Sequence, residues 1–299
     1  MAYLMHIGFD NNSRLWKDVY YFEYKGVRYK LIQNKKKWCD VLLTIIPNHN
    51  DKKAIDYAYI NASEFLSALS WGNHSLVKVH YLGGAGFPDN FNLRNAKCRA
   101  YDFPEVPFRG DSAGYDINCI PEIETEEQRD ALTLFREALS LNNYYLAFLF
   151  FWQILDIGKN DAIGWTNNAL RNNRNKIKLS KDQLERLPLK GKLLGNYLWD
   201  DCRNAIAHIH SRRAGKVKLK LDTPEDNTRI RLSTTVIEEL TRFYIKDKLQ
   251  LRKNMWLVRK KGKGFPVFVN EDFIKKNPCI IAYKEPSLSF EQIKKKRWH

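Results

Sequence analysis

The sequence predicts an α+β protein in which a β-rich amino-terminal domain is followed by a helical bundle and a small basic extension. Aromatic and β-branched runs dominate the first third of the chain, and helical periodicity begins near residue 125. The carboxy-terminal region combines short strand patterns with many lysines. Because a chain of 299 residues exceeds the size at which a single core stops growing, we expect separate domains at residues 1–120, 121–250 and 251–299.

The amino-terminal domain is expected to consist mainly of strands. The runs 19–24 and 27–32 flank Lys25-Gly26 and predict a hairpin, and residues 38–46 predict a buried strand. Residues 61–69 predict one short helix with Asn61 as its N-cap, and a strand is expected over 75–82. The run 83–86 (Gly-Gly-Ala-Gly) is interpreted as a turn, because it lacks the Lys-Ser/Thr of a P-loop. Proline and glycine over 102–121 predict a linker.

Helices are expected to dominate the middle of the chain. Thr125 and Gln128 have the spacing of a capping box, which predicts a helix start. Amphipathic patterns predict helices over 130–141 and 143–157, and the second is apolar on nearly every face, as in the central helix of a bundle. The remaining expected elements are short helices over 161–168 and 181–186, a long helix over 191–210, strands over 216–221 and 228–232, a helix over 233–249, and a hairpin formed by 256–259 and 266–269.

The composition argues against several classes of protein. No stretch of about 18 apolar residues predicts a membrane span, and the amino terminus lacks the basic and apolar regions of a secretion signal. The five cysteines are scattered, without a C-x2-C pair, which argues against a disulfide scaffold and a zinc site. We therefore expect a cytoplasmic protein that has no membrane contact, no metal and no cofactor.

Positive charge is concentrated in two stretches. The net charge is +16, residues 171–192 contain eight basic and two acidic residues, and residues 252–299 contain 13 and four. Such clusters attract the phosphates of nucleic acids, although a basic run is also typical of a solvated surface. Together the two stretches favour nucleic acid, with seven candidate contacts: Arg171, Arg174, Lys176, Lys178, Lys260, Lys261 and Lys263.

The most specific motif runs from Arg203 to His208, with Asn204 directly after the arginine. In a regular helix, with 100° per residue, five apolar residues form a core-facing stripe: Leu198, Cys202, Ala205, Ile206 and Ile209. The opposite surface is polar: Asp200, Arg203, Asn204 and His208. An arginine can stabilise the negative charge of a phosphate, a histidine can transfer protons near neutral pH, and an asparagine can orient the imidazole or a phosphate oxygen.

This motif, late in a four-helix pattern, resembles the R-x(4–6)-H motif of HEPN-superfamily ribonucleases over residues 125–249. The resemblance implies a metal-independent endoribonuclease in which the RNA 2′-hydroxyl attacks at a composite site between two copies of the chain. Arg203, Asn204 and His208 would be catalytic, with His210 and Asp200 as secondary candidates. Many HEPN relatives carry an acidic residue in an early helix of the bundle. Because Gln153 lies in the middle of that helix and Asp156 at its end, we assign that role to neither.

The resemblance also implies a setting and a set of partners. We expect a homodimer that cuts RNA in bacterial toxin or anti-phage defence, with the β-rich domain as a sensor and with a regulatory partner protein. The alternative is a non-catalytic RNA-binding or sensor protein with the same basic surface. A structural alternative also stands, in which Arg203 pairs with Asp200 and His208 is an exposed residue without function. Separately, the amino-terminal region resembles bacterial proteins described under methylamine utilisation, a name that specifies no chemistry.

Overall fold

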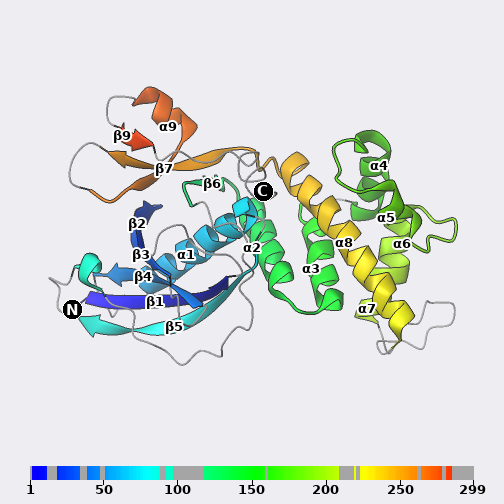
Figure 1. The fold of residues 1–299 in the computed structure, drawn as a ribbon, viewed down its shortest axis with the longest axis horizontal. Helices are drawn as coiled ribbons and strands as arrows, with labels where there is room; N and C mark the ends of the chain where they lie inside the picture. The colour runs from blue at the N-terminus through cyan, green and yellow to red at the C-terminus, as the bar shows by residue number, and fades with distance from the viewer. Residues whose placement is uncertain are drawn as a thin grey trace, which may run out of the picture. The chain divides into compact units, whose positions relative to one another are not determined.

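A computed structural model of the chain confirms the α+β class (Figure 1). The structure describes residues 2–11, 19–33, 39–47, 51–73, 75–87, 92–96, 117–158, 161–208, 219, 223–260, 264–277 and 281–284. The chain forms two compact units, one of Met1–Ile123 with Arg252–His299 and one of Glu124–Leu251. The carboxy-terminal segment, expected to be a separate extension, therefore belongs to the same unit as the amino-terminal strands.

The described strands of the first unit form one sheet of nine strands. The strands are β1 (Ala2–Asn11), β2 (Val19–Tyr24), β3 (Val27–Ile32), β4 (Cys39–Ile46), β5 (Val77–Phe87), β6 (Cys119–Pro121), β7 (Asn254–Lys260), β8 (Val267–Asn270) and β9 (Ile281–Lys284). Their order is β5-β1-β4-β3-β2-β8-β7-β6, with β9 also paired to β7. A single parallel bridge, Glu23 with Val267, links β2 to β8, and the other strand pairs are antiparallel.

Both predicted hairpins are confirmed. Lys25 and Gly26 connect β2 to β3 with φ angles of 47° and 77°, which suit the twist of a two-residue hairpin turn. The hairpin of β7 and β8 has Leu257 opposite Phe268. Strand β4 agrees with the expected buried strand, whereas β1, β6, β9 and the helix α9 (Glu271–Lys276) were not foreseen.

A buried aromatic cluster joins the two segments of this unit. Phe22 of β2 lies 4.6 Å from Phe65 of helix α1 (Lys52–Asn73), measured between ring centroids. Phe268 of β8 lies 5.6 Å from Phe22 and 5.7 Å from Phe65. Large rings at these separations contribute dispersion energy and bury apolar area, so they hold the carboxy-terminal hairpin against the first core.

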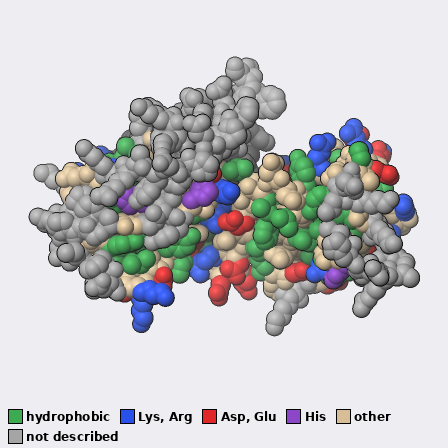
Figure 2. All heavy atoms as spheres, turned by 90° about the horizontal axis from the view of Figure 1, so that it is seen from below, with side chains coloured by type: hydrophobic (Ala, Val, Ile, Leu, Met, Phe, Trp, Pro, Cys, Tyr) green, Lys and Arg blue, Asp and Glu red, His purple; other side chains and the backbone are tan. Residues whose placement is uncertain are grey.

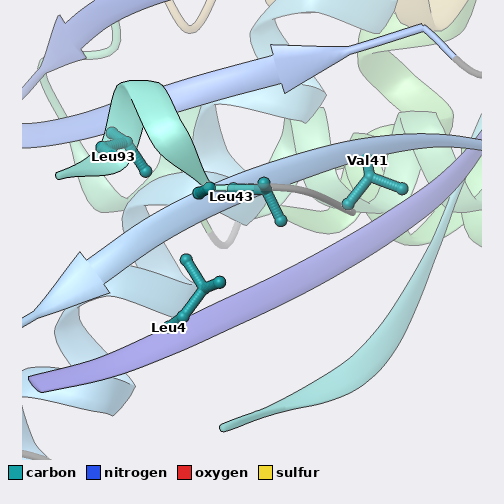
Figure 3. Packing of buried hydrophobic residues seen from close by; sticks show 5 residues of the cluster. Leu4, Val41, Leu43 and Leu93 are labelled. Carbon is teal, nitrogen blue, oxygen red and sulfur yellow. The ribbon is translucent and has the colours of Figure 1, made fainter. Parts of the chain in front are cut away.

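The opposite face of the sheet carries a second, smaller cluster. Figure 3 shows four of its members, Leu4, Val41, Leu43 and Leu93, and Ala96 completes the cluster. Leu93 belongs to a short 3-10 helix, η1 (Leu93–Asn95), which the buried Lys30 ties to the sheet. The Lys30 ammonium donates to the carbonyl oxygens of Arg94 (2.8 Å) and Ala96 (2.6 Å).

Helix α1 is much longer than the helix predicted over 61–69. Asn61, expected as an N-cap, lies inside it and donates its side-chain amide to the Tyr57 carbonyl oxygen at 2.9 Å. The first turns of α1 are largely exposed and lack the apolar periodicity that marks the later turns. The pattern therefore revealed only the part of the helix that packs against the sheet.

The glycine-rich run 83–86 is not a turn, because β5 continues through it to Phe87. A Cβ atom at Gly84 would lie 2.3 Å from Cζ of Tyr3 and 2.5 Å from the Leu4 carbonyl oxygen. Glycine therefore lets the Tyr3 ring of the neighbouring strand lie directly over the backbone of β5.

The second unit is a set of packed helices: α2 (Glu126–Ser140), α3 (Tyr144–Asp156), α4 (Ala162–Asn173), α5 (Lys181–Glu185), α6 (Leu194–Tyr197), a π-helical segment η2 (Leu198–Arg203), α7 (Asn204–Ala207) and α8 (Pro224–Asp247). The capping box at Thr125 and Gln128 is present as predicted. Helix α3 contacts α2, α8, η2 and α7, which is the central position that its apolar sequence predicted.

Hydroxyl groups of helix α8 contact backbone carbonyl oxygens in and just after α3. Thr241 donates to the Phe151 carbonyl oxygen (3.3 Å) and Tyr244 to that of Ile157 (2.7 Å), while the Thr234 hydroxyl lies between the carbonyl oxygens of Tyr144 (3.1 Å) and Ile230 (2.8 Å). The strand predicted over 228–232 is wrong, because these residues form the second turn of α8, which Pro224, Glu225 and Asp226 begin. Of the strand expected over 216–221, only residue 219 lies within the described structure, without strand pairing.

We predict that Gly84→Ala destabilises the sheet unit by about 1–3 kcal/mol, because neither the Leu4 backbone nor the packed Tyr3 ring can move without strain. Differential scanning calorimetry of the whole chain should show a lower transition temperature. Gly264→Ala is the matched control, since a Cβ atom there would meet no atom within 4 Å. Equal transition temperatures for the two variants would contradict the role given to Gly84.

Candidate functional site

The segment with the predicted site residues is not the regular helix expected over 191–210. Helical structure begins at Leu194 and ends at Ala207, and residues 198–203 form a π-helix. The Asn204 amide donates to the Trp199 carbonyl oxygen, five residues earlier rather than four. A widened turn of this kind changes the angle between successive side chains, so the regular value of 100° per residue does not describe residues 198–203.

A half-buried arginine from α8 supports the widened turn. Arg229 donates from Nη1 to the Asp201 carbonyl oxygen at 2.8 Å and from Nη2 to Asp226 Oδ1 at 2.8 Å. The Asp201 side chain is buried and accepts a hydrogen bond of 2.8 Å from the Lys192 ammonium. Each of these charged side chains therefore has a partner of opposite charge, and all of the partners belong to the helical unit.

The inner side of the segment is a small buried polar network. The Tyr197 hydroxyl lies 3.1 Å from Ser233 Oγ, and the Cys202 thiol donates to the same oxygen at 3.4 Å. Burial raises the pKa of the Cys202 thiol, which disfavours the thiolate and argues against a nucleophilic role. The core-facing stripe is confirmed for Leu198, Cys202, Ala205 and Ile206, while Ile209 lies outside the described residues.

The outer side brings Arg203 and Asn204 together on an aromatic surface. Arg203 Nη1 donates to Asn204 Oδ1 at 3.0 Å, and its guanidinium carbon lies 4.6 Å from the centroid of the Trp199 ring. The Trp199 ring in turn lies 5.3 Å from that of Trp152 in α3. Arg203 and Asn204 are both half-buried, so this is a fixed arginine rather than a mobile surface side chain.

Asp156, at the end of α3, belongs to the same cluster. Partial burial raises the pKa of its carboxyl group, whereas the Arg203 charge acts in the opposite direction. No role was assigned to Asp156 from the sequence, and neither Trp199 nor Trp152 was singled out as a site residue. An aspartate that ends an otherwise apolar helix was the one available signal.

The other predicted residues do not join this cluster. His208 ends α7 and is exposed, and among the described residues its imidazole makes no hydrogen bond or ion pair. Asn204 Oδ1 accepts from Arg203, so Asn204 does not orient the imidazole as expected. Asp200 lies 3.9 Å from the Lys192 ammonium rather than pairing with Arg203, and His210 lies outside the described residues.

The predicted RNA-binding residues fall into two groups. Arg171, Arg174, Lys176 and Lys178 lie at or just after the end of α4, in the helical unit. Figure 2 shows several Lys and Arg side chains on the surface of this unit, at the right of the view. Lys261, Lys263 and the side chain of Lys260 lie outside the described structure, so no geometry can be given for the second group.

Comparison with known proteins links the helical unit to one family. A family model described as methylamine utilization protein MauJ matches residues 131–246, which is 116 of the 299 residues. No curated protein and no solved structure matches the chain. The match lies in the helical unit, not in the amino-terminal region where the sequence suggested a methylamine-utilisation resemblance.

This finding corrects the assignment made from the motif. The matching family is not a HEPN family and covers the segment on which the HEPN resemblance depended, so that resemblance is wrong. The expected HEPN-type endoribonuclease, with its toxin and anti-phage setting, is wrong for the same reason. The catalytic roles that the resemblance implied for Arg203, Asn204 and His208 lose their basis with it.

Two further findings concern the described residues only. They contain no group of three or more His, Cys, Asp or Glu side chains that could hold a metal ion. None of their helices is both long and apolar enough to cross a membrane.

We predict that Arg229→Gln destabilises the helical unit by about 1.5–3 kcal/mol, the range for a hydrogen bond to a charged group. The variant removes the donors to Asp201 and Asp226, which leaves the widened turn without its support. Urea unfolding should show the loss. Arg231→Gln, an exposed site on the same helix, should change the stability by less than about 0.5 kcal/mol.

We further predict that Arg203→Gln raises the pKa of Asp156, because it removes a nearby positive charge that favours the carboxylate. The pKa of Asp156 in the folded chain is already above the ordinary 3.8. Protonation of Asp156 therefore favours the folded state: this stabilisation is fully present below pH 3.8 and declines as the pH rises through the folded-state pKa. A carbon-detected NMR titration of the Asp156 carboxyl group measures the change. An unchanged or lower pKa would show that the two groups are not neighbours in solution.

Proposed function

We propose that this chain binds RNA through a basic surface of its helical unit, made by Arg171, Arg174, Lys176 and Lys190. We call these four residues the α4 cation set. They lie at the end of α4 and in the turn before α6, and Arg171, Lys176 and Lys190 are exposed. The observation that carries the proposal is that none of the four has a carboxylate at ion-pair distance among the described residues.

The other basic residues of the same stretch behave differently. Lys181 pairs with Glu185 (3.4 Å), and Arg186 pairs with Asp182 (2.9 Å). Lys192 is bound to Asp201. Each of these three cations therefore has an acidic partner within the helical unit. The α4 cation set has no such partner among the described residues, and its members are free to displace counterions from a phosphate backbone.

A neighbouring lysine supports a positive potential in this region. The pKa of Lys246 in α8 is lowered first by burial and then by the charges of Lys178 and Arg242, against an opposing effect of Glu239. Lys178 and Arg242 are therefore close enough to Lys246 to repel its charge, and Glu239 offsets part of this repulsion. A polyanion is the class of ligand that would relieve this repulsion.

No catalytic step is part of this proposal, and the description of the matching family names no ligand or reaction beyond methylamine utilization. We place the binding in the cytoplasm, which is supported by Cys119 and Cys202, neither of which forms a disulfide within the described structure. The homodimer and the regulatory partner protein expected from the sequence are kept as proposals. A dimer would present two copies of the α4 cation set to one RNA.

We predict that replacing the α4 cation set by glutamine lowers the salt dependence of RNA binding. The slope of log affinity against log salt should fall by about 3, since each neutralised phosphate contact on a single strand contributes about 0.7. Fluorescence anisotropy of a labelled single-stranded RNA, between 50 and 300 mM KCl, measures this slope, with a DNA of the same sequence alongside.

The control removes four exposed cations from the other unit: Lys52, Lys53, Lys78 and Arg259. Both variants change the net charge by the same amount, so only the position of the charge differs. An equal loss of slope in the two variants would show general attraction rather than binding at the α4 cation set. The absence of RNA affinity in the unaltered chain would overturn the proposed function.

A further inference from the structure

The sheet unit contains a pocket of about 750 Å³ that the proposed function does not use. It lies where the β2–β3 turn, the end of β4, the start of α1 and η1 come together, as its lining by Gly26, Pro47, Ala54 and Leu93 shows. This volume falls within the range of pockets that bind small molecules. The described lining lies entirely within one unit, so the pocket needs no particular arrangement of the two units.

One part of the wall is apolar and firmly supported. Leu93, a member of the buried cluster that includes Leu4 and Leu43 (Figure 3), lines the pocket, and so do Ile45 and Phe265, which pack against that cluster. The ring of Phe265 is also held edge-on by Tyr21, with the centroids 5.9 Å apart. This wall is therefore preformed and suits the apolar body of a ligand, in particular a flat ring.

The charge around this wall is positive. The guanidinium carbons of Arg28 and Arg94 lie 5.4 and 5.7 Å from the centroid of the Phe265 ring. Glu23 is the one acidic residue in the described lining, and it lies 3.3 Å from Arg28 Nε. That contact uses one of the five N–H donors of Arg28, whose terminal nitrogens have no partner among the described residues.

The neutral polar groups of the lining also favour a ligand that accepts hydrogen bonds. Asn92 Oδ1 already accepts from the Arg94 amide at 2.9 Å, which leaves its NH₂ group as the available donor. The Tyr57 hydroxyl already donates to the Lys25 carbonyl oxygen at 3.0 Å. Arg28 and Asn92 thus offer donors, and a ligand must bring acceptors to match them.

We propose that this pocket binds a small amphipathic anion, with its carboxylate or phosphate on Arg28 and its apolar ring against Phe265, Ile45 and Leu93. The guanidinium fork of Arg28 can donate two parallel hydrogen bonds to two oxygens of either head group. A cationic ligand is disfavoured by Arg28 and Arg94 together, and a neutral one leaves the terminal nitrogens of Arg28 without an acceptor.

Isothermal titration calorimetry of the full chain tests this with one ring system and four head groups: 2-naphthoate, 2-naphthyl phosphate, 2-naphthylmethanol and 2-naphthylmethylammonium. At least one of the two anions should bind, and the comparison between them identifies the preferred head group. The alcohol should bind at least about tenfold more weakly, and the ammonium should not bind. Equal binding of the anion and the ammonium, or no binding of any probe at millimolar concentration, would overturn the proposal.

Substitutions locate the binding within the pocket. Arg28→Gln should weaken the anion at least about tenfold and leave the weak binding of the alcohol unchanged. Glu23→Gln should strengthen anion binding a few-fold, because it removes the carboxylate that competes for Arg28. Phe265→Leu should weaken the anions and the alcohol alike.

Lys78→Gln, an exposed site on β5 outside the described lining, is the matched control and should have no effect. Circular dichroism checks that each variant is folded. The glutamine variant of the α4 cation set should bind the naphthyl anion normally, so failure of one proposal is distinguishable from failure of the other. An Arg28→Gln variant that is folded and binds the anion as before would refute the role given to Arg28.

Discussion

The pairing of β6 with β7 is the constraint on which the two-unit architecture depends. Pro121 lies opposite Asn254 across these antiparallel strands, and the Glu122 amide donates to the Lys253 carbonyl oxygen at 2.9 Å. Within the helical unit the ends also meet, because the Gln128 side chain donates to the Leu249 carbonyl oxygen at 2.8 Å. The helical unit is therefore an insertion between two neighbouring strands, and both of its ends are fixed at one place. On the far side of this insertion β7 and β8 extend the sheet, and Phe268 packs in the core of the first strands.

This constraint also explains how much of the fold the sequence could reveal. The Lys25-Gly26 hairpin and the Thr125 capping box depend on residues a few positions apart, and both were predicted correctly. The pairing of β6 with β7 joins residues more than 130 positions apart, and a single sequence carries no signal for it. The three successive domains expected from the sequence therefore became two units, with the last segment in the first of them. The error at 228–232 has a different, local origin, since alternating polar and apolar residues suggested a strand where Pro224 begins a helix.

The candidate site shows the same division between local and distant information. The contact between Arg203 and Asn204 joins adjacent residues, and the buried stripe behind them follows from periodicity. The widened turn was not predictable, because helical arithmetic assumes that each amide bonds four residues back, whereas the Asn204 amide bonds five residues back. Asp156 and Trp152 reach the cluster through the packing of α3 on η2, which only the fold specifies. The motif thus indicated a real local arrangement but not what that arrangement does.

The two units use arginine in physically different ways, and this difference separates the two proposed activities. The members of the α4 cation set lie mostly at the surface, where salt screens charges beyond about 8 Å at physiological ionic strength, so their attraction for a polyanion depends strongly on counterions. Arg28 is also exposed, but it lies over the Phe265 ring beside an apolar wall, so one ligand can place an anionic head group and a ring on neighbouring groups at once. Binding at the surface is therefore expected to be governed by the number of phosphates contacted, and binding in the pocket by the fit of one head group and one ring. A single chain can carry both because the strand pairing that closes the helical insertion leaves each unit with its own core.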